Sequence, residues 1–183
     1  MNLTTYFKHA PDTAIYPKHL GVLYLAAKLA GEIEELRAAL EAGASNRPNW
    51  VKEAGDVLWY WAMIQHELGT DEFKVIEYVL LLRLDEVSYT SSTRRTITDD
   101  FVGLFSDTAR ILEPVAKSFR DDGGVINEDR RSEIEFRLLL IYVGLREVMD
   151  KHAVSMDEIM QANYDKLHSR KERGVLGGGG DDR

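Results

Sequence analysis

The sequence predicts an all-α protein, a bundle of about six helices in one compact unit. Apolar residues recur at steps of three and four along most of the chain. No segment shows the alternation of apolar and polar residues that a half-buried strand requires. The chain has 183 residues, 44% of them hydrophobic and 30% charged, and this is enough for one domain with a sizeable core.

The first half of the chain is predicted to hold three helices. The first spans about residues 18–42, on a stripe of leucine and isoleucine. The second begins at Pro48, because proline suits the first turn of a helix, and stops at Gly69. The third begins at residue 70 or 71 and ends at about residue 87. Its YVLLLRL segment is apolar enough to be buried on more than one side.

A polar, turn-rich break, SYTSSTRRTITDD, precedes three further helices in the second half. The fourth helix spans about 99–119, and Pro114 within it is expected to kink or interrupt it, because proline removes a backbone donor. The fifth spans about 128–151. The sixth opens at Ser155, where Glu158 completes a capping-box pattern.

Composition and charge exclude several classes of protein. The absence of cysteine excludes a disulfide framework, a cysteine-ligated zinc site and a thiol nucleophile. The formal charge of −8 argues against a nucleic-acid binder that works through a broad basic surface. No run approaches the length of a membrane span, and the opening MNLTTYFKHAPD lacks a signal-peptide core. We therefore expect a cytoplasmic protein with neither a membrane nor a nucleic acid as partner.

Two pairs of acids, Glu32 with Glu35 and Glu53 with Asp56, lie three residues apart and so share a helical face. A short loop at 43–49 would make the two helices antiparallel neighbours, so that both pairs converge. Four carboxylates that close together need a neutralising partner. Because oxygen ligands without histidine or cysteine suit Mg²⁺, the sequence predicts a magnesium site in which Mn²⁺ can substitute.

The same acids also allow two other interpretations. Acidic pairs at this spacing are common on solvated helix faces, and Glu34 and Glu41 are expected to be such residues. Glu53 and Asp56 differ from them because they directly precede the apolar segment VLWYWAMI, at the edge of the core. A ferritin-like di-iron site needs Glu-x-x-His on paired helices, and no predicted helix has that spacing.

Two glycines adjoin the acids. Gly31 and Gly55 cost a helix roughly 1 kcal/mol each, so their presence needs a reason. A missing Cβ at these positions would let a backbone or a ligand approach closely.

Four segments carry a resemblance to a known family. They are GEIEEL at 31–36, EAGDVLWY at 53–60, NYDKLHSR at 163–170, and KSFRDDGG at 117–124. The chain resembles the MazG-like all-α nucleoside triphosphate pyrophosphohydrolases, whose ending has the pattern Asn-x-x-Lys-Leu-x-x-Arg. EAGDVLWY after a GExxEL helix is the more specific match, whereas KSFRDDGG alone is a weak one.

The resemblance implies hydrolysis of a (deoxy)nucleoside triphosphate to the monophosphate and pyrophosphate, as a control of the nucleotide pool. It implies that the four acids hold Mg²⁺, and that Glu35 or Glu53 is the base that activates water. The candidate substrate contacts are Lys117, Arg120, Asn163, Lys166 and Arg170. Trp59, Tyr60 or Trp61 could face the base, although packing in the core is the better expectation. The preferred base and sugar stay open.

The halves also resemble two degenerate copies of one unit, at 14–90 and 99–172, followed by a glycine-rich tail at 173–183 that is expected to be mobile unless a ligand orders it. The counterparts of the four acids, in chain order, are Asp107, Arg110, Arg137 and Leu140. We therefore expect a fused pseudo-dimer with one working centre, in which the first half supplies the acids and the second supplies Asn163 and Lys166. Alternatively, the second half is only a scaffold, in which the two arginines form ion pairs. Assembly stays open between a monomer and a homodimer.

A different class of function also fits these features. The chain would then be a non-catalytic helical module of the same fold that binds a nucleotide or a partner protein. A helical scaffold with incidental acids is a third reading. The presence of all four acids favours the enzyme.

Overall fold

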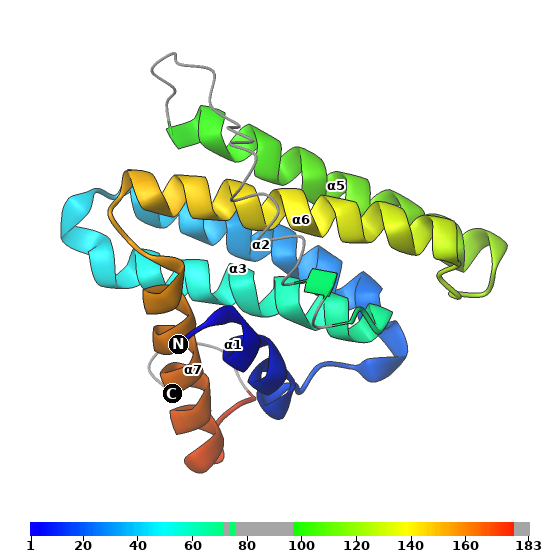
Figure 1. The fold of residues 1–183 in the computed structure, drawn as a ribbon, viewed down its shortest axis with the longest axis horizontal. Coiled ribbons are helices and arrows are strands. Elements are labelled where there is room, and N and C mark those ends of the chain that lie inside the picture. The colour runs from blue at the N-terminus through cyan, green and yellow to red at the C-terminus, as the bar shows by residue number, and fades with distance from the viewer. Residues whose placement is uncertain (72–73, 76–96, 178–183) are drawn as a thin grey trace.

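The computed structural model describes residues 1–71, 74–75 and 97–177, and every regular element in this part of the chain is a helix (Figure 1). The all-α prediction is therefore confirmed. The α-helices are α1 (Leu3–His9), α2 (Gly21–Glu41), α3 (Arg47–Leu68), α5 (Ile97–Asp121), α6 (Glu128–Lys151) and α7 (Met156–Glu172). Short 3₁₀ turns lie at Ala10–Thr13, Lys18–Leu20 and Ala44–Asn46.

The first two predicted helices agree closely with α2 and α3. Helix α3 carries Pro48 in its first turn, as expected. It ends before Gly69, which adopts the left-handed φ of 65° that favours glycine at a helix end. The helix predicted at 70–87 lies almost wholly outside the described residues, as does the end of the glycine-rich tail.

The second half confirms two helix boundaries and corrects one expectation. Helix α6 has the predicted bounds, and the Ser155 hydroxyl caps α7 by accepting from the backbone N–H of Glu158 at 3.2 Å. The expectation that Pro114 interrupts its helix is wrong, because α5 runs without a break from Ile97 to Asp121. Pro114 is buried, and α5 packs along both α6 and α2, so tertiary contacts outweigh the missing hydrogen bond.

Helix α1 was not predicted from the sequence. It has only seven residues, LTTYFKH, which is too short for a helical period to be recognised. The Asn2 side chain caps it by accepting from the backbone N–H of Thr5 at 2.9 Å. Tyr6 and Phe7 are both buried, so packing against the rest of the protein stabilises this short helix.

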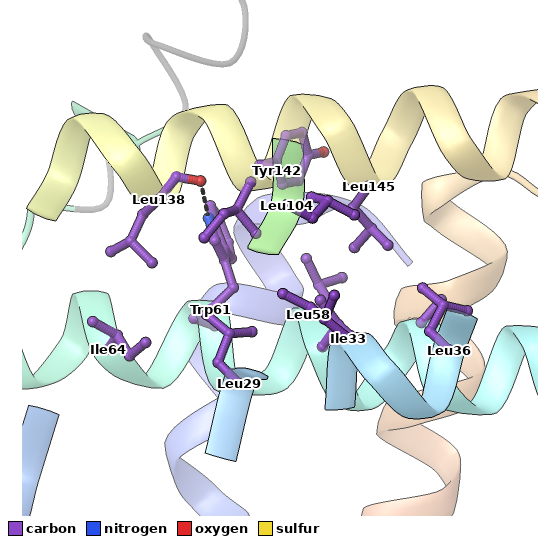
Figure 2. Close-up of a cluster of buried hydrophobic side chains, with 14 of the residues drawn as sticks. Leu29, Ile33, Leu36, Leu58, Trp61, Ile64, Leu104, Leu138, Tyr142 and Leu145 are labelled. Carbon is purple, nitrogen blue, oxygen red and sulfur yellow. Dashed lines mark hydrogen bonds between the residues drawn. The ribbon is translucent and has the colours of Figure 1, made fainter. Parts of the chain in front are cut away.

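Two antiparallel hairpins, α2–α3 and α5–α6, pack side by side and enclose the main core (Figure 1). Figure 2 shows the centre of this core, where leucine and isoleucine side chains of α2 and α3 meet Leu104 of α5 and Tyr142 of α6. Trp61 is 1% exposed and donates its indole N–H to the carbonyl oxygen of Leu138 at 2.8 Å. Trp61 therefore packs in the core, as the helical stripe predicted.

Helices α1 and α7 lie against α3, on the side away from α5 (Figure 1). The Trp59 indole N–H donates to the carbonyl oxygen of Ala10 at 3.1 Å, and a ring nitrogen of His66 lies 2.7 Å from the carbonyl oxygen of Phe7. These contacts hold the N-terminal segment on α3. Among the described helices, none combines the length and the apolar character needed to cross a bilayer.

Candidate metal centre

The α2–α3 hairpin brings three of the four predicted acids together. Carboxylate oxygens of Glu32 and Glu35 from α2 and of Glu53 from α3 all lie within 4.8 Å of one another. We call these three residues the acidic cluster. Glu32 and Glu53 are buried, at 8% and 5% exposure, whereas Glu35 is exposed. The cluster therefore sits where the core meets the solvent, as the sequence pattern indicated.

Two lysines lie against the buried members of the acidic cluster. Lys28 Nζ is 3.1 Å from Glu32, and Lys52 Nζ is 3.1 Å from Glu53. Neither lysine was predicted from the sequence, although Lys28 precedes Glu32 by four residues, a spacing that places the two side chains on one helix face. These ion pairs offset part of the negative charge of the cluster.

The fourth acid, Asp56, is directed at α7 and is not part of this compact group. Its Oδ1 accepts from Lys166 Nζ at 2.5 Å and from Asn163 Nδ2 at 3.1 Å. Asn163 and Lys166 were both predicted as site residues, and the structure brings them to one of the predicted acids across more than 100 positions of sequence. Arg170 is buried further along α7, at helical spacing from them.

Gly55 explains how α7 approaches so closely. A Cβ added at Gly55 would lie 2.8 Å from the Cβ of Asn163, which is closer than real side chains come. Nothing lies within 4 Å of a Cβ added at Gly31, so no described atom requires a glycine there. Of the two glycines beside the acids, only Gly55 therefore serves a close approach within the described structure.

The electrostatics of the acidic cluster favour the entry of a cation. Burial, followed by the charge of Asp56, raises the pKa of Glu32. Burial also raises the pKa of Glu53, with the charges of Asp56 and Glu35 adding to it, even though Lys52 opposes the rise. A raised carboxyl pKa means that the charged form is under-stabilised in the metal-free protein. A bound cation would relieve this.

The donor set fits a hard divalent ion. All the candidate ligands are carboxylate oxygens, the type that Mg²⁺ and Mn²⁺ prefer. In an octahedral Mg²⁺ site, neighbouring ligand oxygens are ~3 Å apart and opposite ones ~4 Å apart. The cluster oxygens, within 4.8 Å of one another, need only small side-chain movements to reach such spacings.

Two predicted substrate contacts lie elsewhere. Lys117 pairs with Glu113 at 2.8 Å, and Arg120 pairs with Asp121 at 2.6 Å, in each case within the last turns of α5. Among the described residues, no recorded ion pair joins either of them to the acidic cluster. The KSFRDDGG segment that contains them was also the weakest part of the family resemblance.

The α5–α6 hairpin places an ion pair at the positions that were predicted to be the counterparts of Glu32 and Glu53. Asp107 of α5 is 5% exposed, and its carboxylate lies 3.3 Å from Arg137 of α6. Arg110, the predicted counterpart of Glu35, is exposed. An arginine facing an acid leaves no excess negative charge to attract a metal ion.

The charges of the acidic cluster act on Tyr60. It is part-buried, and burial together with the charge of Glu32 raises the pKa of its hydroxyl. Lys28 Nζ lies 5.9 Å from the centre of its ring. Trp59, in contrast, directs its indole N–H at the N-terminal segment.

The chain is similar to a protein of a bacteriophage. The Gene 37 protein of Mycobacterium phage L5 is 33% identical to this chain over 82 residues, which are 45% of this chain and 72% of that protein. No family model matches the chain. No solved structure matches it.

Proposed function

We propose that this chain, which belongs to the same family as the Gene 37 protein of Mycobacterium phage L5, hydrolyses a (deoxy)nucleoside triphosphate to the monophosphate and pyrophosphate in a Mg²⁺-dependent reaction. One observation carries the proposal. Three carboxylates from α2 and α3 converge, and beside them Asp56 meets Asn163 and Lys166 of α7. These are the residues on which the resemblance to MazG-like pyrophosphohydrolases depends.

Each residue of the site has a role in this proposal. Glu32, Glu35, Glu53 and Asp56 would hold Mg²⁺, which supplies positive charge to the phosphate oxygens when bound. Lys166 and Asn163 carry donors at the edge of the acid group and would bind phosphate or sugar oxygens. Tyr60 would border the base or sugar.

Glu35 is the better placed of the two candidate bases. Its side chain faces solvent, where an attacking water is available. Glu53 is buried, and its carboxylate pairs with Lys52 at 3.1 Å. A general base needs direct access to the water that it deprotonates.

The primary test is the release of pyrophosphate from a panel of ribo- and deoxynucleoside triphosphates in the presence of Mg²⁺. We expect pyrophosphate and the monophosphate as products, with no turnover in EDTA. Glu53→Gln should lower turnover by at least about 100-fold, because it removes the negative charge of a metal ligand. Its helical content by circular dichroism should match that of the unmodified chain.

A matched control is available on α2. Glu34 neighbours Glu35 in sequence but is exposed and pairs with Arg37 at 2.6 Å, outside the acidic cluster. Glu34→Gln should therefore leave turnover within twofold of the unmodified chain. Release of orthophosphate in place of pyrophosphate, or equal losses in the two variants, would refute the proposal.

One observation favours a second candidate, a helical module that binds a nucleotide or a partner without turnover. Glu32, Glu53 and Asp56 each pair with a lysine, so much of the negative charge is already offset by the protein. Under this alternative, nucleotide binding measured by calorimetry persists in EDTA and no pyrophosphate is released. If the chain is the proposed enzyme, nucleotide binding is lost in EDTA and pyrophosphate is released in the presence of Mg²⁺.

A further inference from the structure

The short helix α1 reaches the candidate centre through a single buried hydroxyl group. Tyr6 is 2% exposed, and its hydroxyl donates to Asn163 Oδ1 of α7 at 2.8 Å. The two residues are 157 positions apart. Neither the family resemblance nor the sequence pattern singled out Tyr6.

Two hydrogen bonds hold the amide of Asn163, one at each end. An asparagine side chain accepts through its oxygen and donates only through its nitrogen. Its Oδ1 accepts from the Tyr6 hydroxyl, and its Nδ2 faces Asp56, at 3.1 Å from the Asp56 Oδ1. With the amide reversed, two oxygens would face each other at this distance, which is unfavourable.

The surroundings confine Asn163 in position. It is 1% exposed, and its Cβ packs on Gly55 so closely that no Cβ fits there. The amide therefore cannot move out into the solvent. The motion that remains is rotation of the amide about the Cβ–Cγ bond. The Tyr6 hydroxyl removes that freedom.

The fixed amide of Asn163 in turn orients the carboxylate of Asp56. Both donors recorded for its carboxylate, Asn163 Nδ2 and Lys166 Nζ, use Oδ1. Within the part of the chain that the structure describes, the second oxygen, Oδ2, is then the one that remains for a metal ion. Fixing one carboxylate oxygen in this way fixes the direction in which the other points.

We propose that Tyr6 is a positioning residue of the metal centre, which orients Asp56 as a ligand by fixing the amide of Asn163. This inference rests on the proposed function, because it requires a metal ion at these carboxylates. It assigns to the N-terminal segment a role in the site as well as in packing. Tyr6 itself touches neither metal nor substrate.

The test is the affinity of the chain for Mn²⁺ alone, measured by isothermal titration calorimetry. Tyr6→Phe keeps the ring and its packing and removes only the hydroxyl. Groups that orient metal ligands typically contribute ~10- to 100-fold to metal affinity, and Tyr6 acts one step further out, so we expect a loss of about 5- to 10-fold. Circular dichroism should show unchanged helical content.

Tyr16→Phe is the matched control. Tyr16 is also buried, and its hydroxyl also donates to a carboxylate, that of Glu67, but among the described residues no hydrogen bond connects it to Asn163. Removal of the Tyr16 hydroxyl should leave the Mn²⁺ affinity within twofold of that of the unmodified chain. If both variants weaken binding equally, the effect is one of general stability and the inference is wrong.

A double-mutant cycle separates positioning from packing. Asn163→Ala removes the amide through which Tyr6 is inferred to act, so adding Tyr6→Phe to it should weaken Mn²⁺ binding no further. Additive losses would contradict the inference. Tight Mn²⁺ binding by the unmodified chain with no change in Tyr6→Phe would overturn the inference alone, whereas no Mn²⁺ binding by the unmodified chain would overturn the proposed function and the inference with it.

Discussion

The two hairpins of the bundle bury acidic side chains in different ways. In α5–α6, Glu135 accepts from Thr70 at 2.9 Å, from Lys74 at 2.8 Å and from Arg131 at 3.1 Å, and Asp107 faces Arg137. In α2–α3, Glu32 and Glu53 each pair with one lysine and stand beside further carboxylates.

The difference appears in the pKa values of the buried acids. Burial alone would raise the pKa of Glu135, but the hydrogen bonds from Lys74, Thr70 and Arg131 outweigh it and lower the pKa. The pKa values of Glu32 and Glu53 are raised, mainly by burial. A buried acid therefore does not by itself mark a site. An acid whose charge the protein under-stabilises is the better indicator.

The largest expected effect is on metal affinity, which should depend on the acids of α2–α3 and not on those of α5–α6. Glu32→Gln in α2 should weaken Mn²⁺ binding by at least about 100-fold, because it removes a ligand rather than a group that orients one. Asp107→Asn in α5 should leave Mn²⁺ binding within twofold. Calorimetric titration measures both affinities. A comparable loss of Mn²⁺ affinity in the two variants would contradict the prediction that only the α2–α3 hairpin binds the metal ion.

The second expected effect is on stability. Here Asp107→Asn should have the larger effect and Glu32→Gln the smaller one, the reverse of their order for metal affinity. Asp107→Asn should lower the free energy of unfolding by about 3 kcal/mol, because breaking a buried ion pair leaves Arg137 without its charge partner. Glu32→Gln in metal-free buffer should change it by less than about 1 kcal/mol, since an under-stabilised charge is removed. Urea unfolding followed by circular dichroism gives both values. A larger loss in the α2 variant would refute this comparison.

The third expected effect is a difference of sign in pH dependence. The pKa of Glu135 lies below its ordinary value of 4.5, so its contribution to stability is present above pH 4.5 and is lost as the pH falls through the lowered pKa. Glu135→Gln should therefore destabilise the protein at pH 7, and less so as the pH falls below 4.5. Urea unfolding in EDTA at several pH values measures this dependence.

The cluster acid Glu53 should behave in the opposite sense. Its pKa lies above its ordinary value of 4.5, so its stabilising contribution is present below pH 4.5 and is lost as the pH rises through the raised pKa. Relative to the unmodified chain in EDTA, Glu53→Gln should gain stability as the pH rises from 4 to 7. If the stabilities of the two variants changed with pH in the same direction, the opposite pKa shifts assigned to Glu135 and Glu53 would be wrong.

The smallest expected effects compare the two glycines of the α2–α3 hairpin. Gly55→Ala should lower the free energy of unfolding by about 1–2 kcal/mol, because its Cβ would press on Asn163. Gly31→Ala meets no atom within 4 Å and should raise it by roughly 0.5–1 kcal/mol, the usual gain from replacing a glycine within a helix. Urea unfolding measures both, and equal effects would remove the evidence for close packing of α7.

The sequence by itself determined the helical class, most helix boundaries and the convergence of three of the four acids. These features depend on interactions within one or two helical turns, such as the three-residue spacing of Glu32 and Glu35 or the Ser155 cap. The short connection between α2 and α3 then made antiparallel packing the expected arrangement. Local spacing and loop length are visible in one sequence, and so this part could be predicted.

Only the tertiary structure decided which groups complete the site. Packing of α1 against α7 joins Tyr6 to Asn163, and the close approach of α7 at Gly55 brings Asn163 and Lys166 to Asp56. Packing also keeps α5 continuous through Pro114. The physical reason is the same in each case. Contacts between residues far apart in the sequence depend on how helices are arranged in space, and the periodicity of a single helix does not specify that arrangement.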